Sequence, residues 1–366
     1  MNAPPRIAVV RMDNLGDHVL GSGLLDALRT LHPAAKIRMV VPAGLADLYA
    51  RCPLHSELML LPSHETYCKD PDLRDGLVKH VAAGEKFDLV VSPRFAGDYY
   101  FAGMICEALG SATSRRIGFL QVDSPYEDYD ANECFTELLE APEDLHASRY
   151  AGRIAEHLSM DSGKVVGSVD PVVWYSVEDV ERVGRRWPAG DRPWVALGCG
   201  ASFPFKLPEP SVMVHVVDRL VNTWGQRVIL VGSKADEEFA APILAAFPGH
   251  HDVQSAIGEL KLYETSALLS QARLYVGPDS GPMHMAAAVG IPVIELDWVP
   301  EGYPAKSRGP LTAGRCWEPW ARRGISVRPD PARFAAQRES AGFASEFSKG
   351  ISLGDVDRAL RTMLSD

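Results

Sequence analysis

Short apolar runs alternate with segments of helical spacing along this chain, and this alternation constrains the fold more than any other feature. Residues 6–12 (RIAVVRM) form one such run, which a glycine-containing turn joins to a helical pattern. Similar runs at residues 37–41, 57–62 and 88–93 are each followed by a helical stretch. Runs that are apolar on both faces are typical of parallel strands with helices on both sides of the sheet. The first half is therefore predicted to be an α/β domain, closed by a helix at residues 146–160.

A second series of the same kind begins after Pro193. Its apolar runs are residues 194–198, 227–232, 272–277 and 291–297. The sequence therefore predicts two Rossmann-like α/β domains, residues 1–170 and 171–345, followed by an amphipathic helix at about 350–366. Two such domains with parallel sheets facing each other create a cleft, and ligands are expected there, at the loops that follow the carboxyl ends of the strands.

Composition and charge exclude several classes of protein. The 366 residues include 46% hydrophobic and 23% charged residues, as in an ordinary globular protein. The net charge of −11 argues against a nucleic-acid binder. No run approaches the roughly 18 apolar residues of a membrane span, and the first strand begins too early for a signal peptide. We therefore expect a soluble, cytoplasmic protein whose six scattered cysteines, none in a CxxC pair, are buried reduced thiols.

Two segments have a strongly one-sided charge. Residues 121–144 contain nine carboxylates and no lysine or arginine, and a solvated loop is predicted there. The nine are Asp123, Glu127, Asp128, Asp130, Glu133, Glu137, Glu140, Glu143 and Asp144. Residues 306–338 contain eight basic residues, against Glu318 and Asp330. This basic segment is compatible with peripheral association at the inner face of a membrane.

The loop after the first strand, MDNLGDHVLGSG, places Asp17 directly after Gly16, where a helix begins. Asp17 fits two roles. As a helix N-cap it would stabilise the fold by about 0.5–2 kcal/mol; as a cleft residue its carboxylate would serve as a general base toward a bound hydroxyl. Asp13 is the rival base, although it lies nearer the strand end and suits a loop-holding role. The loop lacks both G-x-G-x-x-G and G-K-[ST], which weakens dehydrogenase and NTPase interpretations.

Two loops in the second half offer groups for a diphosphate. In GPDSGPMHMAAAVG, Asp279, Ser280 and Gly281 follow a strand and precede a helix, whose free N–H groups and dipole favour an anion. His284 lies one turn later, where a core histidine is the alternative. In GCGASFPFKLPEP, Ser202 and Lys206 lie in a loop bounded by glycine and proline. A lysine there would neutralise a leaving phosphate, unless it is an ordinary exposed lysine.

Three segments together resemble glycosyltransferase family 9, the ADP-heptose:lipopolysaccharide heptosyltransferases and their relatives. They are MDNLGD, GASFPFK and PDSGPMHMAAAVGIPVI, and the resemblance follows the whole chain in order and spacing. It implies a GT-B fold of two Rossmann-like domains, with the final helix packing back on the first. It also implies inverting, metal-independent transfer from an ADP-activated heptose as co-substrate, with no cofactor.

The resemblance also implies roles for individual residues. The catalytic aspartate of the family falls on Asp17, next to Gly16. The donor-binding positions of the family fall on Ser202, Lys206, Asp279, Ser280, Gly281 and His284, and Gly16 is placed with them as a donor-binding residue. The acidic residues expected to hold the ribose are Asp236 or Glu237, and Leu260 is placed on the donor side with them. Asp13, Asn14 and Arg94 are candidates for the acceptor side.

Departures from the family concern the acceptor and the sugar. The acidic segment 121–144, if it faces the cleft, would repel an anionic lipopolysaccharide core and favour a neutral or cationic small molecule. Trp298 and Tyr303 replace a glycine- and proline-rich family segment, and either stack on a base or sugar or pack in the interior. The DPD at 70–72 and the DYD at 128–130 do not follow strands, so no metal site is predicted from them.

Two other functions fit the same architecture. A sugar-nucleotide epimerase would release free nucleotide from the donor without any acceptor. A non-catalytic sugar-nucleotide-binding protein would not need the Asp17, Lys206 and Asp279 set. The complete set argues against the non-catalytic protein, and the sequence favours a glycosyltransferase over both alternatives.

Overall fold

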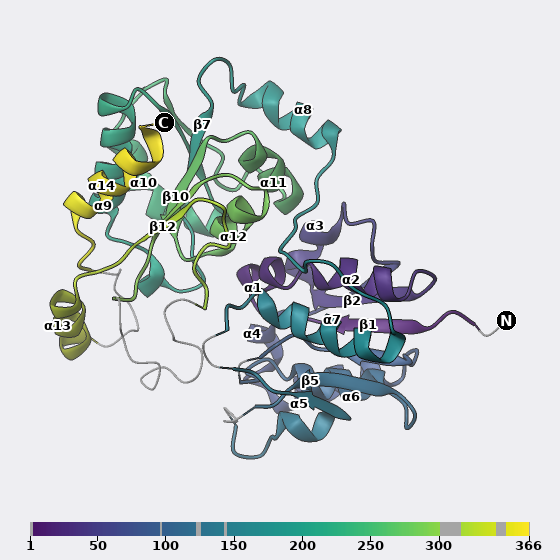
Figure 1. Cartoon of the computed structure of the whole chain (residues 1–366). Helices are drawn as coiled ribbons and strands as arrows, with labels where there is room; N and C mark the ends of the chain where they lie inside the picture. The colour runs from purple at the N-terminus through teal and green to yellow at the C-terminus, as the bar shows by residue number, and fades with distance from the viewer. Residues whose placement is uncertain are drawn as a thin grey trace. The chain divides into compact units, whose positions relative to one another are not determined.

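The computed structural model describes residues 3–95, 97–121, 126–142, 145–300, 316–341 and 349–365 (Figure 1). The chain divides into two compact units between Pro171 and Val172. The boundary predicted from the sequence lies between residues 170 and 171. Each unit is described on its own below.

The first unit is built on a six-stranded parallel sheet with the strand order β3-β2-β1-β4-β5-β6. Its strands are β1 (Arg6–Val10), β2 (Lys36–Pro42), β3 (Glu57–Leu61), β4 (Leu89–Val91), β5 (Arg115–Phe119) and β6 (Glu137–Leu139). Its helices are α1 (Leu15–Leu20), α2 (Leu24–Leu31), α3 (Ala46–Tyr49), α4 (His64–Tyr67), α5 (Pro71–Ala82), α6 (Ala102–Leu109) and α7 (Arg149–Ser162).

Both faces of the central strand β1 are buried, as its continuous apolar sequence predicts. Ala8 and Val10 belong to a core cluster that includes residues of α5 and α6. Ile7 and Val9 point to the opposite face and are buried as well. β1 pairs in parallel with β2 on one side and β4 on the other, so the carboxyl ends of three strands lie next to one another.

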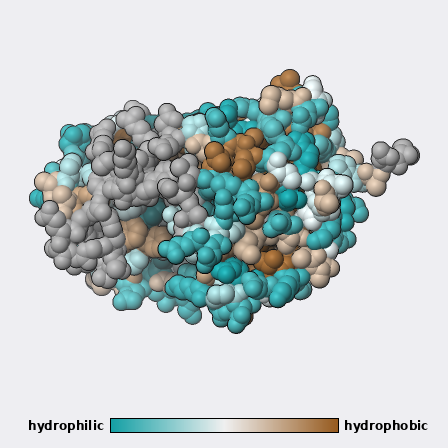
Figure 2. Space-filling view, turned by 90° about the horizontal axis from the view of Figure 1, so that it is seen from below, coloured by the Kyte–Doolittle hydropathy of each residue, from teal (hydrophilic) through white to brown (hydrophobic). Residues whose placement is uncertain are grey.

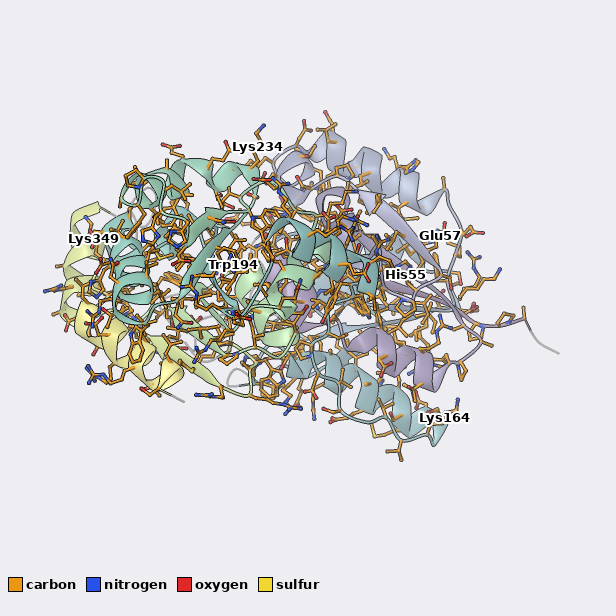
Figure 3. The ribbon with its side chains drawn as sticks, turned by 90° about the horizontal axis from the view of Figure 1, so that it is seen from above. His55, Glu57, Lys164, Trp194, Lys234 and Lys349 are labelled. Atoms are coloured by element: carbon orange, nitrogen blue, oxygen red, sulfur yellow. The ribbon has the colours of Figure 1, made fainter. Side chains whose placement is uncertain are left out.

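The second unit has the strand order β12-β11-β10-β7-β8-β9, again all parallel. Its strands are β7 (Trp194–Gly198), β8 (Arg227–Val231), β9 (Val253–Ser255), β10 (Leu274–Pro278), β11 (Val293–Leu296) and β12 (Gly324–Val327). Its helices are α8 (Val177–Arg186), α9 (Pro210–Asp218), α10 (Glu237–Ala245), α11 (Leu262–Ser270), α12 (Gly281–Ala288), α13 (Pro331–Ala341) and α14 (Leu353–Leu364). The Trp194 side chain of β7 lies in the interior of this unit (Figure 3).

The C-terminal helix α14 packs on the second unit, so the expectation that it packs back on the first is wrong. Its apolar side, including Val356 and Leu360, joins the core cluster that α9 and α10 form on one face of the sheet. Polar contacts hold it there as well, because Asp357 accepts hydrogen bonds from His215 at 3.0 Å and Arg219 at 3.1 Å. Burying the apolar stripe of an amphipathic helix against the nearest available core accounts for this position.

The acidic segment 121–144 is more ordered than the solvated loop predicted for it. Residues 137–139 form the edge strand β6, where Glu137 accepts hydrogen bonds from Arg115 at 2.6 and 2.7 Å and from His157 at 2.7 Å. Asp130 accepts a hydrogen bond from Asn132 N at 2.8 Å and so caps a short 3₁₀ turn at residues 131–134. Asp123, Glu143 and Asp144 lie outside the described residues.

The helical stretch predicted after residues 57–62 is two helices, α4 and α5. Asp70 separates them, since its carboxylate accepts hydrogen bonds from Asp72 N and Leu73 N at 3.0 and 3.1 Å. Pro71 occupies the first turn of α5, where a missing N–H costs nothing. Asp70, the first aspartate of the DPD segment, and Asp130, the last aspartate of the DYD segment, are therefore helix and turn caps.

The described helices include none long and apolar enough to cross a membrane. On the face shown in Figure 2, hydrophobic patches alternate with hydrophilic residues. All six cysteines lie in described parts of the chain and none is in a disulfide; five are buried and Cys68 is half-buried.

Candidate functional site

In both sheets the strands are parallel, and the order in which the chain adds them reverses at the same position. Numbered within its own unit, each sheet runs 3-2-1-4-5-6, the order of a Rossmann fold. Ligands of such sheets bind outside the carboxyl ends of the strands at the point where the order reverses. That point lies between β1 and β4 in the first unit and between β7 and β10 in the second. The sequence-predicted residues Asp17, Arg94, Lys206 and Asp279 follow exactly those four strands.

In the first unit, Asp13 is the centre of a buried charge cluster. Arg11 binds it with two hydrogen bonds, Nε to Oδ1 at 3.1 Å and Nη2 to Oδ2 at 2.8 Å. His18 Nε2 lies 3.5 Å from Oδ1, and Arg94 Nη1 lies 3.6 Å from Oδ2. Gly21 leaves room for this cluster, because a β-carbon there would overlap Arg11 Nη1. With its side chain only 2% exposed, Asp13 is placed to hold the loop rather than to meet a substrate.

The cluster shifts two pKa values. Burial opposes ionisation of Asp13, but the charges of Arg11, His18 and Arg94 outweigh it and lower the pKa of Asp13 to about 2. Burial lowers the pKa of His18 to about 4, against the opposing effect of Asp13. His18 is therefore neutral near pH 7, and its Nδ1 is 2.9 Å from the hydroxyl of Tyr49.

Asp17 lies in the first turn of α1, two residues after the helix begins. The N-cap of α1 is Asn14, so the alternative in which Asp17 itself caps the helix does not hold. Asp17 and Gly16 are both half-buried, unlike the fully buried Asp13. A carboxylate in the first turn is stabilised by the helix dipole. The structure thus places Asp17, and not Asp13, where a ligand can reach it.

Two of the acceptor-side candidates, Asn14 and Arg94, contact an aromatic side chain. Asn14 Nδ2 donates to the Tyr100 hydroxyl at 3.3 Å. The Arg94 guanidinium lies 4.5 Å from the ring centroid of Tyr100, and His64 makes an edge contact with the same ring at 4.5 Å. Arg94 is also held by the carbonyl of Gly97 at 3.0 Å. Tyr100 and His64 were not identified from the sequence, because only the fold brings them to this loop.

In the second unit, Lys206 and Asp279 form an ion pair across the reversal point. Lys206 Nζ lies 2.6 Å from Asp279 Oδ2, and His284 Nε2 lies 3.7 Å from Oδ1. Burial opposes ionisation of Asp279, but Lys206 and His284 hold its pKa well below the ordinary range. His284 is buried, and within the described residues its Nδ1 has no hydrogen-bond partner. These contacts bring together three residues that lie up to 78 positions apart in the sequence (284 minus 206).

Helix α12 begins at this ion pair, as its sequence predicts. Ser280 is the N-cap residue but makes no side-chain capping bond; its Oγ is 3.3 Å from the hydroxyl of Tyr275. Gly281 and Pro282 form the first turn. Gly198 and Gly277 leave space for the Tyr275 ring, because a β-carbon at either position would overlap it. The N–H groups at the start of α12 therefore lie beside a lysine and suit an anionic ligand.

The remaining donor-side candidates follow the neighbouring strands. Asp236 follows β8, where its Oδ2 accepts hydrogen bonds from Ser233 N at 2.6 Å and Ser233 Oγ at 2.8 Å. Glu237 is exposed at the start of α10, and Leu260 is half-buried between β9 and α11. Ser202 is exposed in the loop after β7. These four residues line the edge of the sheet on the β7, β8 and β9 side.

Trp298 is a donor-side residue whose role the sequence left open. Its Nε1 donates to Asp279 Oδ2 at 3.4 Å, and Lys206 Nζ lies 5.8 Å from its ring centroid. The Trp298 side chain therefore contacts both members of the ion pair. Tyr303, the other aromatic residue of that segment, lies outside the described residues.

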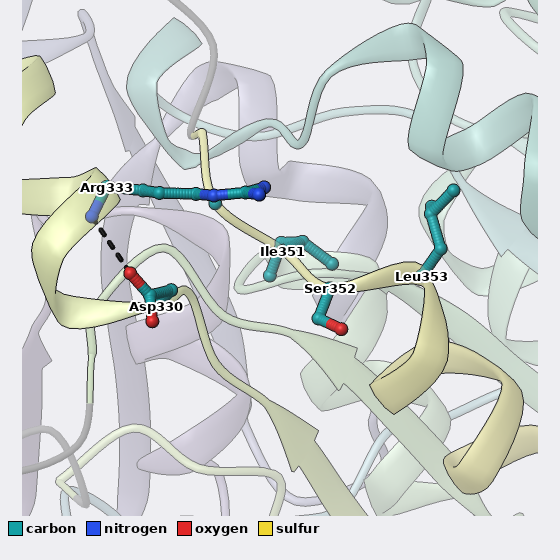
Figure 4. Close-up of a pocket in the computed structure, with 6 residues that line it drawn as sticks. Asp330, Arg333, Ile351, Ser352 and Leu353 are labelled. Carbon is teal, nitrogen blue, oxygen red and sulfur yellow. Dashed lines mark hydrogen bonds between the residues drawn. The ribbon is translucent and has the colours of Figure 1, made fainter.

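Several basic residues of the segment 306–338 are engaged or outside the described part of the chain. Lys306, Arg308 and Arg315 are outside it, and the side chain of Arg338 is not described. Arg328 is paired with Asp297 at 3.1 Å and with Glu318 at 2.5 Å. Arg333 lines a cavity of about 440 Å³ where α13 and α14 begin, with Asp330, Gly350, Ile351, Ser352 and Leu353 (Figure 4). None of the predicted site residues lines that cavity.

The low pKa of His18 predicts a pH-dependent contribution to stability. The unfolded state takes up a proton near pH 6.5 while the folded state does so near pH 4, so stability is lost as the pH falls between these values. We expect the stability difference between the wild type and His18→Gln to shrink by roughly 3 kcal/mol from pH 7 to pH 4. Urea unfolding at several pH values measures it. The matched control is His80→Gln on the exposed side of α5; a pH-independent difference for His18→Gln would contradict the prediction.

Comparisons with known proteins show which sequences and folds this chain resembles. Residues 155–296 match the sequence model of glycosyltransferase family 9 (heptosyltransferase). This range contains every donor-side candidate of the second half, whereas Gly16, Asp13, Asn14, Asp17 and Arg94 precede it. Lipopolysaccharide heptosyltransferase 2 of Salmonella typhimurium is 26% identical over 306 residues, which is 80% of this chain and 82% of that protein.

Solved structures show the same fold. Escherichia coli ADP-heptose lipopolysaccharide heptosyltransferase II has a TM-score of 0.70 and 18% identity, over 98% of both chains. A family 9 glycosyltransferase of Veillonella parvula has a TM-score of 0.73 and 17% identity, over 100% of this chain and 98% of that one. At these identities the likeness establishes the fold and leaves the substrates open.

Proposed function

We propose that this chain, a glycosyltransferase with an α/β GT-B fold that resembles the family 9 heptosyltransferases, transfers a heptose from ADP-heptose to a small acceptor with inversion. The observation that carries this proposal is the Lys206–Asp279 ion pair at the start of α12, beside the reversal point of the second sheet. A lysine and free helix N–H groups provide positive potential where a diphosphate would lie. The related heptosyltransferase II of known structure is named for ADP-heptose, which supports this donor.

Asp17 is proposed as the general base. It accepts the proton of the acceptor hydroxyl as the acceptor oxygen forms its bond to the anomeric carbon of the donor. The bond between that carbon and the diphosphate oxygen breaks on the opposite side, so the configuration inverts and ADP leaves. Asp13 keeps the loop in place through Arg11, so that Asp17 extends from a fixed helix start.

Lys206 and the start of α12 are proposed to stabilise the departing diphosphate. Negative charge grows on the leaving oxygen during transfer, and fixed donors aimed at that charge lower the barrier. Asp279 and Trp298 hold Lys206 in position through the contacts described above. On this proposal a protein cation takes the role that a divalent metal has in other nucleotide-sugar enzymes.

A neutral or cationic small molecule is proposed as the acceptor. Asn14 and Arg94 lie against Tyr100, which also contacts His64, and the cations Arg11 and Arg94 are both paired with Asp13. Unlike Lys206, whose side chain is 22% exposed, Arg11 and Arg94 are only 7% and 11% exposed, so they offer little positive charge to an anionic acceptor. The ordered part of the acidic segment adds little to this argument, because Glu137 is neutralised by Arg115. An acceptor screen should compare neutral and cationic small molecules with lipopolysaccharide acceptors, for which the relatives are named.

The proposed donor class is tested by thermal unfolding with ADP, UDP, GDP, TDP and NAD, each in EDTA and again in MgCl₂. A ligand that binds only the folded state at 100 times its Kd stabilises it by about 2.7 kcal/mol. We expect ADP to raise the melting temperature most, and equally in EDTA and in magnesium. If another nucleotide raises the melting temperature most, that nucleotide replaces ADP in the proposal. A strict need for magnesium would contradict the metal-free mechanism. No response to any diphosphate would refute the proposal that the protein binds a nucleotide sugar.

A further inference from the structure

Three aromatic side chains adjoin the Lys206–Asp279 pair on the second unit. Phe203 and Phe205 come from the loop after β7, and their rings are stacked, with centroids 5.2 Å apart and planes inclined by 6°. Trp298 comes from the loop after β11 and lies 4.7 Å from the Phe205 ring. Phe203 is 48% exposed, although an exposed phenylalanine gains nothing from contact with water. We call these three residues the aromatic wall.

The strand order shows which part of a nucleotide sugar the aromatic wall would meet. Asp236 and Glu237, the residues expected to bind the ribose, follow β8. The residues proposed to bind the diphosphate follow β7 and β10. β11 is the next strand on the far side of β10, and Trp298 follows it. Neighbouring strands are about 4.8 Å apart, so β8 and β11 are separated by roughly 14 Å along the sheet edge. A ligand with its nucleoside near β8 and its diphosphate at β7 and β10 therefore has its sugar beside Trp298.

The position of Trp298 is fixed by its neighbours rather than by the ligand. Arg328 holds the adjacent Asp297 at 3.1 Å, and the same carboxylate accepts a hydrogen bond from Val299 N at 3.2 Å. The Trp298 indole N–H donates to Asp279, which also binds Lys206. Rigid aromatic surfaces with a few fixed polar groups are typical of sites that orient a small ligand.

We propose that Phe203, Phe205 and Trp298 form the subsite for the sugar ring of the nucleotide-sugar donor, with the apolar C–H face of a pyranose against the aromatic wall. This inference rests on the proposed function, because it needs a nucleotide sugar bound through Lys206 and α12. It assigns the discrimination between sugars to the aromatic wall, and the discrimination between nucleotides to the β8 side of the sheet.

The test compares the binding of ADP with that of ADP-heptose by titration calorimetry on the full chain. Phe203→Ala removes a ring that is 48% exposed, so its folding risk is small. We expect it to weaken ADP-heptose binding about 3- to 10-fold while ADP binding changes less than 2-fold. Trp298→Phe keeps a ring but removes the indole N–H, and we expect it to weaken ADP-heptose more than ADP as well.

The matched control is Leu353→Ala, an equally exposed apolar side chain that lines the cavity of Figure 4. It should leave both affinities unchanged. The subsite is refuted, with the proposed function intact, if the wild type binds both ligands and Phe203→Ala binds ADP-heptose normally or loses both ligands equally. If the wild type binds neither ligand, the proposed function fails and the subsite fails with it.

Discussion

Replacing Asp17 by asparagine is expected to lower kcat about 10²- to 10⁴-fold, the usual effect of losing a general base. The amide is nearly isosteric with the carboxylate but accepts no proton, so the helix start and the fold should be preserved. The affinity for ADP should not change, because the donor groups proposed here all lie on the second unit. Initial rates with the best acceptor from the screen, together with calorimetry of ADP, measure both quantities.

Asp26→Asn provides the control for this prediction. Asp26 lies in the first turn of α2, as Asp17 does in α1, and it is exposed. The same chemical change there should leave kcat within 2-fold of the wild type. Normal turnover of Asp17→Asn would remove the assignment of the base. An equal loss in both variants would indicate that a carboxylate in the first turn matters for stability and not for proton transfer.

The arrangement of strands was predictable where the sequence is apolar without interruption. The limits of β7 (Trp194–Gly198) and α14 (Leu353–Leu364) agree with the predicted segments. β5, β6, β9 and β12 were missed, since all four are short and three of them carry polar residues such as Arg115, Glu137 and Gln254. Short strands of this kind form because neighbouring strands supply hydrogen bonds, and that information is not local. The predicted packing partner of α14 was wrong for the same reason, because the apolar stripe of an amphipathic helix does not specify which core the helix joins.

The site residues that lie directly after an apolar strand were predictable from the sequence. Asp17, Lys206 and Asp279 were named because each follows an apolar run, and parallel strands bring such positions to one edge of a sheet. The buried partners were not predictable. His18 and Arg11 owe their roles to contacts with Asp13, and Trp298 owes its role to a contact with Asp279 from another strand. No spacing in the sequence encodes those contacts, because they depend on how adjacent loops pack.

Replacing Lys206 by alanine is expected to weaken ADP binding at least 10-fold and to lower kcat/KM about 10²- to 10³-fold. The variant removes the only lysine that contacts Asp279 among the described residues, so both the ground-state charge contact and the transition-state stabilisation of the leaving group are lost. It also leaves the buried Asp279 carboxylate with a weaker set of partners, Trp298 and His284. A buried charge that loses its partner is destabilising, and the second unit should therefore unfold at a lower temperature.

The double variant Lys206→Ala, Asp279→Asn separates these two effects. Neutralising Asp279 removes the unpaired buried charge, so the melting temperature should recover toward that of the wild type. ADP affinity should not recover, because the cation that faces the diphosphate is still absent. Lys79→Ala on the exposed side of α5 is the control for loss of a lysine and should change neither quantity. If ADP affinity recovers together with stability in the double variant, Lys206 serves the fold alone and the diphosphate contact must be assigned to other residues.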